Sequence, residues 1–357
     1  MKTFSLMTLA ARPHQKLLVW SFLIWVMLSG CLKDRLQVVS VSGKTMGTQY
    51  HLKYLPHENS PSAAEVQQLV DVLLGEIEAK MSTYKPDSEL SQFNRSRSTK
   101  PFVVSPETVS VVSEAILIGH ASGGALDITV LPLVELWGFG AKERVDEPPA
   151  KGKIQAALAD LGLNQLSVDP KNLTIKKAKK NLSVDLSAIA KGYAVDQVSE
   201  LLQVLGLTNH LVEIGGELRT AGTKTEGEPW SVGIEEPDGP PGTVQRILPL
   251  SGYAMATSGD YRNYFEKDGL RYSHTINPQT GVPIQHHLAS VSVIATDCMS
   301  ADGWATALNV LGEEKGFALA ERKGLIAYFI YRDQNVFKIK ETAAFKTYEQ
   351  LANSQSE

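Results

Sequence analysis

The chain has 357 residues, a formal net charge of −4 and 21% charged residues, which is typical of a folded protein with one large domain or two closely joined ones. The first 30 residues carry three basic residues, Lys2, Arg12 and Lys16, and no acidic one, so removal of this segment would leave a more acidic chain. An acidic chain without a broad basic region is not expected to bind nucleic acid.

Residues 1–30 are typical of an export signal, because the basic residues accompany the apolar run "LLVWSFLIWVML" at 17–28, which is too short to span a bilayer comfortably. The sequence "LSGC" at 28–31 resembles a bacterial lipobox, and Cys31 would then be the lipidated first residue of the mature chain. The alternative is an ordinary signal peptide with an incidental cysteine. The other cysteine, Cys298, then has no intrachain disulfide partner, and we interpret it as a small packed residue.

The first half of the mature chain predicts one strand, two helices and a hairpin. After a tether over residues 31–41, "TMGTQYHLKY" at 45–54 predicts a strand, and apolar residues at helical spacing predict an amphipathic helix over 62–84. A second helix is expected to start at Pro106, after the N-cap Ser105. The segment 173–186 predicts a hairpin with its lysines on a solvated turn; a polyanion site there is the less favoured interpretation.

The second half mixes helices and short strands. A helix is predicted from about Ser187 to Leu205, with Gly206 as its stop, and Asp268-Gly269 marks the turn of a hairpin over 264–276. A strand follows at 289–296. The last elements are a helix over 297–312 that ends at Gly312, a short helix and a hairpin over 325–340. Because strands and helices do not alternate regularly, we expect an α+β fold with a single domain over 42–345 and a tail over 346–357.

The helix over 297–312 carries Asp302 and Thr306 on an otherwise broad apolar segment. Residues four apart lie on the same face of a helix, so the carboxylate and the hydroxyl point together. Such a pair can bind a ligand, and the alternative for Asp302 is a helix-capping or core hydrogen-bonding role.

Four loops with many small and polar residues add oxygen ligands, a cation and an imidazole to this pair, and few thiols or clustered histidines are available. Such a set favours Mg²⁺ with a phosphorylated ligand over zinc. The sequence lacks a Walker loop and the GxGxxG, HExxH and GxSxG fingerprints. From the residues alone, we expect an exported, metal-assisted enzyme or a binder of a phosphorylated ligand.

A series of motifs in one order resembles the FAD:protein FMN transferase family, also called ApbE. The resemblance runs from about Thr45 to Gly312. It implies an α+β flavin-binding fold with mixed or antiparallel sheets and flanking helices, and transfer of FMN from FAD to a threonine hydroxyl of a target protein, with Mg²⁺ at the pyrophosphate and release of AMP. The motifs are "MGT", "MSTYKPDSELSQFN", "ALDITVLPL", "WGF", "VDLSAIAKGYAVD", "IGGELRTAG", "ATSGDYRNYF", "RYSHTINPQTG" and "SADGWATALNVLG".

The resemblance also implies roles for single residues. Asp302 and Thr306 would be the side-chain ligands of Mg²⁺, and the backbone carbonyl of Ala188 would complete the set. His274 would be the general base for the acceptor threonine or the group that orients it. The positions that would line the FAD are Met46, Tyr84, Ala125, Leu126, Asp127, Asp185, Lys191 and Ile276.

Two of these positions have ordinary structural alternatives, which are core packing for Met46 and a salt bridge for Lys191.

The family partners that the resemblance implies are flavin-carrying subunits of membrane redox complexes of the Nqr and Rnf type. Lipid anchoring at the periplasmic face of the inner membrane, or on the outer membrane, would suit such partners. The alternative functions are a pyrophosphatase that cuts FAD to FMN and AMP with water, and a periplasmic protein that binds FAD without turnover.

Overall fold

The computed structural model describes residues 37–141, 147–240, 242–259, 264–267, 270–334 and 336–354. The predicted export signal and Cys31 lie outside these residues. The residues from Val38 onward group into one unit by their contacts. Within the described ranges, no helix is both long and apolar enough to cross a bilayer.

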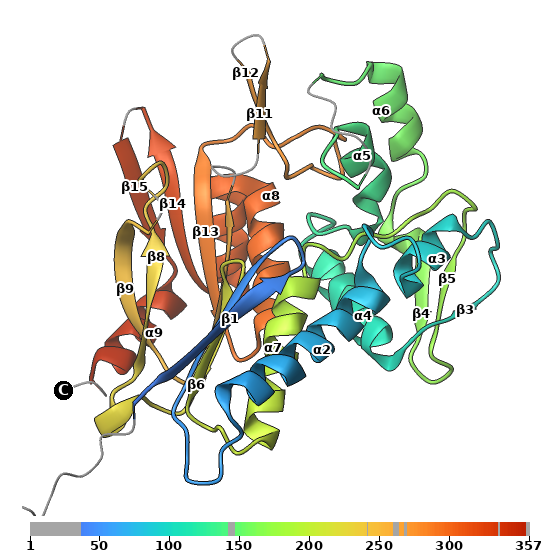
Figure 1. The fold of residues 1–357 in the computed structure, drawn as a ribbon. Coiled ribbons are helices and arrows are strands. Elements are labelled where there is room, and N and C mark those ends of the chain that lie inside the picture. The colour runs from blue at the N-terminus through green and yellow to red at the C-terminus, as the bar shows by residue number, and fades with distance from the viewer. Residues whose placement is uncertain are drawn as a thin grey trace, which may run out of the picture. The chain divides into compact units, whose positions relative to one another are not determined.

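An eight-stranded sheet forms the centre of this unit, and every neighbouring pair of strands in it is antiparallel (Figure 1). An antiparallel sheet agrees with the expected α+β class. In order across the sheet, the strands are β1 (Val39–Thr45), β2 (Thr48–Tyr54), β6 (His210–Ile214), β7 (Glu217–Ala221), β10 (Ala254–Gly259), β13 (Leu288–Ala295), β14 (Ile326–Asp333) and β15 (Val336–Glu341).

The strand β13 shows how the sheet is buried on both faces. Successive side chains of a strand point to opposite faces, and Val291 and Val293 belong to a buried cluster with residues of helix α8 (Cys298–Lys323). Ile294 belongs instead to a cluster with Phe345 of helix α9 (Ala343–Ser354) and with the hairpin β8 (Trp230–Glu235) and β9 (Val244–Leu250). The sheet therefore lies between two layers.

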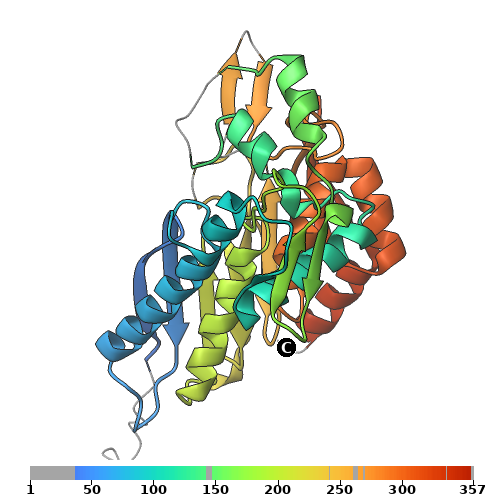
Figure 2. The ribbon, with the colours of Figure 1, turned by 90° about the vertical axis from the view of Figure 1, so that its right-hand side faces the viewer.

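Helices α7 (Ala190–Val204) and α8 pack against one another and against the sheet, and α2 (Ala63–Met81) lies beside both β1 and α7 (Figure 2). Helix α4 (Pro106–Ala121) packs on α8. The predicted starts of α2 and α4 are confirmed: Ser62 forms a capping box with Glu65, and the Ser105 hydroxyl accepts a hydrogen bond from the Thr108 N–H.

Helix α8 is interrupted at Gly312, where the backbone has φ 78° and ψ −178°. The sequence predicts a helix end at this glycine, and the structure places a second helical segment directly behind it. A side chain at position 312 would also be crowded, because a Cβ atom there would lie 2.8 Å from the His286 ring. Gly312 thus combines a left-handed φ with a close approach.

Smaller elements lie outside the central sheet. A separate buried cluster of mainly aromatic and aliphatic side chains joins α5, α6 and the hairpin β11–β12. The elements are α3 (Glu89–Arg95), β3 (Phe102–Val103), α5 (Leu131–Leu136), α6 (Lys151–Leu158), β4 (Leu166–Asp169), β5 (Thr174–Lys177), β11 (Tyr264–Lys267), β12 (Leu270–Ser273) and the 3₁₀ turns η1 (Ile128–Val130), η2 (Leu163–Gln165) and η3 (Thr225–Gly227).

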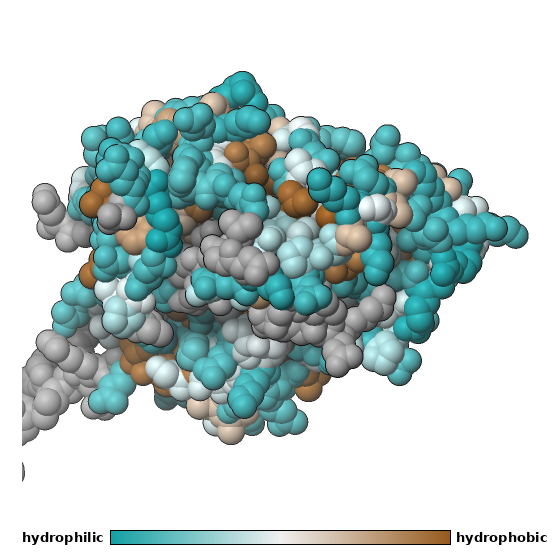
Figure 3. Space-filling model, turned by 90° about the horizontal axis from the view of Figure 1, so that it is seen from above, coloured by the Kyte–Doolittle hydropathy of each residue, from teal (hydrophilic) through white to brown (hydrophobic). Residues whose placement is uncertain are grey.

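The surface seen from above, which is the side on which β11 and β12 project in Figure 1, is mainly hydrophilic (Figure 3). Hydrophobic residues appear on it only as small, separate patches. We therefore expect the described part of this face to make mainly polar contacts.

The predicted solvated lysine turn is wrong at Lys177. The hairpin pairs β4 with β5, so its turn precedes the lysine run, and Lys177 is fully buried at the end of β5. Its Nζ donates to the carbonyls of Phe93 and Leu182 at 3.0 Å. Burial, with a smaller effect of the Arg97 charge, lowers the Lys177 pKa to about 8. A long side chain whose acceptors come from distant segments cannot be recognised in a run of lysines.

Other boundaries also differ from the sequence expectations. Most of the strand predicted over 45–54 is β2, but Met46 and Gly47 adopt positive φ and turn the chain, so β2 is the second strand of a hairpin with β1. Strand β1 starts at Val39, within the predicted tether. The predicted tail contains most of α9, whose Phe345 and Tyr348 are buried. A short amphipathic segment gives little signal before its partner surface is known.

Candidate functional site

A cavity of about 640 Å³ lies where α7, α8, β7, β10 and the segments before η1 and after β12 meet. This volume is in the range of sites for small molecules and cofactors. The structure brings together eleven of the predicted site residues in its walls: Tyr84, Ala125, Leu126, Asp127, Asp185, Ala188, Lys191, His274, Ile276, Asp302 and Thr306.

Met46 lies apart from this set. It lines a neighbouring groove, which shares Glu213, Gly215, Gly216 and Glu235 with the cavity. Its backbone N–H donates to the Glu78 carboxylate at 2.7 Å, so the turn that carries it is tied to α2. The groove is therefore continuous with the cavity, and Met46 is next to the main site rather than in it.

Asp302 occupies the point where α8 crosses the start of α7. Its Oδ2 accepts a hydrogen bond from the Gly192 N–H at 3.0 Å. Gly192 is in the first turn of α7, whose own N-cap, Ile189, supplies no side-chain acceptor. Asp302 therefore has the helix-capping role given above as its alternative, but the helix that it caps is α7 and not α8, to which it belongs. Among the described residues, Asp302 Oδ1 has no hydrogen-bond donor and remains available in the cavity wall.

Lys191 and Glu217 form an ion pair beside Asp302, with 2.6 Å between Nζ and Oε2. Burial raises the pKa of Glu217 to about 7 against the opposing effect of the Lys191 charge. Burial likewise raises the Asp302 pKa, and the Lys191 charge opposes it. For Lys191 itself, burial would lower the pKa, but the charges of Asp302 and Glu217 outweigh it and raise the value. The Lys191 charge therefore acts on two buried carboxylates and is ion-paired with one of them, Glu217.

Glu217 is not among the residues predicted from the sequence, although it lies in the "IGGELRTAG" motif. Its position depends on the turn between β6 and β7, where Gly215 and Gly216 both have positive φ. This turn and the pairing of β7 bring Glu217 against α7. The sequence signal for this residue is a glutamate directly after a glycine pair. The sequence alone does not show that Lys191 is its ion-pair partner.

Asp127 and Asp185 are held on two loops that are joined to each other. The Asp185 N–H donates to the carbonyl of Ile128 at 2.7 Å, and the Asp185 Oδ1 accepts from the Ser187 N–H at 2.9 Å. Asp127 Oδ1 accepts from the N–H and the hydroxyl of Thr129 at 2.8 and 2.6 Å. Burial raises the pKa of both aspartates. Both carboxylates are therefore fixed in direction before any ligand arrives.

The cavity wall is rich in carboxylates. Only one lysine or arginine, Lys191, is among its described lining residues, and it is already paired with Glu217. A pyrophosphate placed here would be repelled unless a cation accompanied it. The lining carboxylates are Asp127, Asp185, Glu213, Glu217, Glu235 and Asp302.

The proposed metal donors fit a small hard cation. Asp302, Thr306 and Ala188 all line the cavity, and the Thr306 hydroxyl lies 3.2 Å from the Ser258 hydroxyl. Within the described ranges, no group of three or more His, Cys, Asp or Glu residues could hold a metal. A set with one carboxylate suits Mg²⁺, which keeps several waters and uses substrate phosphates as further ligands.

His274 directly follows β12 and lies at the edge of the aromatic cluster. The Phe139 ring meets it in an edge-to-face arrangement, with 6.4 Å between centroids. Phe139 also packs on Phe265 of β11 at 5.7 Å, and its carbonyl accepts a hydrogen bond from the Tyr84 hydroxyl at 3.4 Å. These contacts place the imidazole in the cavity wall opposite the helices.

Comparisons with known proteins identify relatives of this chain. A family model described as the ApbE family matches residues 46–330. The chain is 46% identical over 323 residues to the FAD:protein FMN transferase of Vibrio cholerae serotype O1, covering 90% of this chain and 96% of that protein.

Two solved structures share the fold. The flavin transferase ApbE from Vibrio cholerae has a TM-score of 0.81 and 44% identity, and covers 87% of this chain and 99% of that one. The apo flavinyl transferase ApbE from Pseudomonas stutzeri has a TM-score of 0.81 and 42% identity, and covers 88% of this chain and 97% of that one. The expected fold is thereby confirmed.

We predict that Gly192→Ala destabilises the protein by about 1–3 kcal/mol or more, because the new Cβ would lie 2.2 Å from the Cys298 carbonyl oxygen. The matched control is Gly75→Ala in the middle of α2, where a Cβ meets no atom within 4 Å. This control should stabilise the protein by about 0.5–1 kcal/mol. Urea unfolding of the two variants checks both values, and equal effects would contradict the close approach of α7 and α8.

Proposed function

The chain belongs to the ApbE family, and from this membership we propose that it transfers the FMN part of FAD to a hydroxyl group of a target protein. The observation that carries the proposal is the meeting of eleven predicted residues in one cavity. They come from segments that are far apart in the sequence. In the fold, His274 lines the same cavity as Asp302 and Thr306. The full activity is FMN transfer to a threonine hydroxyl with release of AMP.

Mg²⁺ is the proposed cofactor, held by the side chains of Asp302 and Thr306 and the carbonyl of Ala188. It would neutralise negative charge on the pyrophosphate of FAD during the transfer. Contacts within the chain orient the Asp302 carboxylate before a cation binds. The Gly192 N–H fixes one Asp302 oxygen at 3.0 Å and so directs the other, and the Lys191–Glu217 pair limits the charge around it.

FAD is the proposed substrate, with its phosphates near α8 and its rings along the remaining walls. Tyr84 is 65% exposed at the rim and can stack on a ring. Asp127 and Asp185 present fixed carboxylates that can accept hydrogen bonds from hydroxyl or ring N–H groups. These contacts would orient the substrate and leave one face of the phosphate toward His274.

His274 is the proposed general base, or the group that orients the acceptor. In the transfer, the threonine oxygen forms a bond to the FMN phosphorus, and the bond from that phosphorus to the bridging oxygen breaks. The threonine proton passes to the His274 imidazole, and AMP leaves with the bridging oxygen. An imidazole suits this step, because its ordinary pKa allows it to accept a proton near neutral pH.

Incubation of the protein with FAD, Mg²⁺ and a candidate target protein tests the transfer directly. We expect the intact mass of the target to increase by one FMN, AMP to appear in equal amount, and a threonine to carry the flavin. Free FMN without labelled target would favour the pyrophosphatase, and unchanged FAD would favour a protein that only binds it.

We predict that Asp302→Asn lowers the rate of FMN transfer by about 100-fold or more. Asparagine keeps an acceptor for the Gly192 N–H, so the contact between α7 and α8 persists, but the negative charge for the cation is lost. The melting temperature should therefore change little. Transfer at the wild-type rate in a folded Asp302→Asn variant would contradict the metal role.

We further propose that Cys31 carries a lipid and anchors the protein at the periplasmic face of the inner membrane, with the outer membrane as the alternative. The sequence "LSGC" supports this proposal. Such an anchor suits targets in membrane redox complexes of the Nqr and Rnf type, which are the proposed partners. Nucleic acid is not among them.

Cys31→Ser tests the anchor. We expect the wild-type protein to incorporate labelled palmitate and to sediment with membranes, and the variant to lose the label. Both should transfer FMN equally to a target in solution, because position 31 precedes the part of the chain that matches the family, residues 46–330. Retention of the label by Cys31→Ser would rule out this cysteine as the lipid site.

A further inference from the structure

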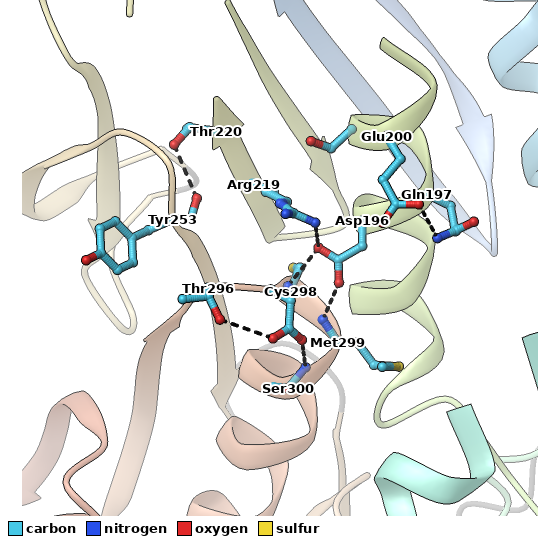
Figure 4. Close-up of polar contacts among 12 residues, drawn as sticks. Asp196, Gln197, Glu200, Arg219, Thr220, Tyr253, Thr296, Cys298, Met299 and Ser300 are labelled. Carbon is cyan, nitrogen blue, oxygen red and sulfur yellow. Dashed lines mark hydrogen bonds and ion pairs between the residues drawn. The ribbon is translucent and has the colours of Figure 1, made fainter. Parts of the chain in front are cut away.

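Asp196 is a buried carboxylate one helical turn after Gly192 on α7, and the proposed reaction does not use it. Figure 4 shows it between the Arg219 side chain and the start of α8. Its Oδ1 accepts hydrogen bonds from Arg219 Nη1 at 2.7 Å and from the Cys298 N–H at 2.9 Å, and its Oδ2 accepts from the Met299 N–H at 2.8 Å. A carboxylate from one helix thus binds the N-terminus of another.

The first turn of α8 is fully supplied with acceptors through this contact. The first four N–H groups of a helix have no partner within it. In α8, Asp196 accepts from the N–H groups of Cys298 and Met299, and the side chain of the N-cap Asp297 accepts from that of Ser300 at 2.8 Å. The next N–H, that of Ala301, donates to the Asp297 carbonyl at 3.3 Å in the first bond within the helix. The helix therefore has its own cap as well as a second one from α7.

The spacing of the contacts fixes α8 along α7. Gly192 and Asp196 are four residues apart on α7, and their partners Asp302 and Cys298 are four residues apart on α8, in the opposite direction. The two contacts are thus about one helical turn apart on both helices. Sliding or rotating α8 would break both at once. Thr306 lies one turn beyond Asp302 on the same face.

Strand β7 also binds this part of α7, through two ion pairs. Glu217 and Arg219 are two residues apart, so their side chains leave the same face of the strand. Glu217 pairs with Lys191 at 2.6 Å, and Arg219 pairs with Asp196 at 2.7 Å. The two ion pairs have opposite polarity, so the charges of Lys191 and Asp196 on α7 are balanced by those of Glu217 and Arg219 on β7.

We propose that Asp196, together with Arg219, is a positioning residue for the metal site. It sets the position of α8 on α7, so that the oxygens of Asp302 and Thr306 face the cavity together. This inference rests on the proposed function, because it assigns to these residues the placement of the proposed Mg²⁺ ligands. Asp196 itself is not among the described residues that line the cavity.

The test measures cation binding without turnover. Wild-type protein and variants are titrated with Mn²⁺, which takes oxygen ligands and is visible by electron paramagnetic resonance. We expect Asp196→Asn to raise the dissociation constant of Mn²⁺ by about 10-fold or more, in the range that outer-shell substitutions produce. Asparagine offers a single acceptor oxygen where the carboxylate serves three donors.

The matched control is Asp297→Asn. It also removes a carboxylate from the N-terminus of α8, but asparagine is an equally good N-cap, and position 297 belongs to α8 itself. We expect Mn²⁺ binding within about twofold of wild type. Equal weakening in both variants would mean that Asp196 acts only through helix stability and would overturn the proposal.

The outcomes separate this inference from the proposed function. Absence of Mn²⁺ binding in the wild type, or undiminished binding in Asp302→Asn, would overturn the metal site itself. Wild-type binding in Asp196→Asn, with loss in Asp302→Asn, would overturn only the positioning role. If Asp196→Asn does not fold, Asp196→Glu is the deciding variant. It keeps the negative charge, but its side chain is longer by one methylene and would shift α8 relative to α7. Unchanged Mn²⁺ affinity in this variant would contradict the proposal.

Discussion

The contact between α7 and α8 at Gly192 is the constraint on which the rest of the site depends. Gly192 has no room for a side chain, since a Cβ atom there would lie 2.2 Å from the Cys298 carbonyl oxygen. The two helix backbones approach closely enough for the Gly192 N–H to reach Asp302 at 3.0 Å. This contact directs the carboxylate, places Thr306 one turn further along the cavity, and brings Lys191 against Glu217.

The charges of the cavity follow from this geometry. Burial raises the pKa of Asp302 and of Glu217, and Lys191 is the cation that opposes the effect for both. A site of this kind stabilises its ionised carboxylates poorly by itself, so a divalent cation would lower its free energy. The same cation would allow an anionic pyrophosphate to bind in a cavity that is lined by several carboxylates. One aspartate thus serves both the packing of two helices and the proposed chemistry.

The sequence predicts the parts of this architecture that depend on local signals. Ser105 is the predicted N-cap of α4, and the four-residue spacing predicts that Asp302 and Thr306 share one face of α8; both line the cavity. The burial of Lys177 and the pairing of Glu217 could not be predicted in this way, because their partners are brought by distant segments. The motif order gave the list of cavity residues through resemblance, and the fold alone shows how they meet.

A crystal structure of the protein with FAD and Mn²⁺ tests the central claim most directly, because the anomalous signal of manganese locates the cation. The account predicts a single strong peak in the cavity, within about 2.2 Å of Asp302, Thr306 and the Ala188 carbonyl oxygen, and next to the pyrophosphate of FAD. A cation bound at other residues, or FAD bound outside the cavity that Asp302 and His274 line, would contradict it.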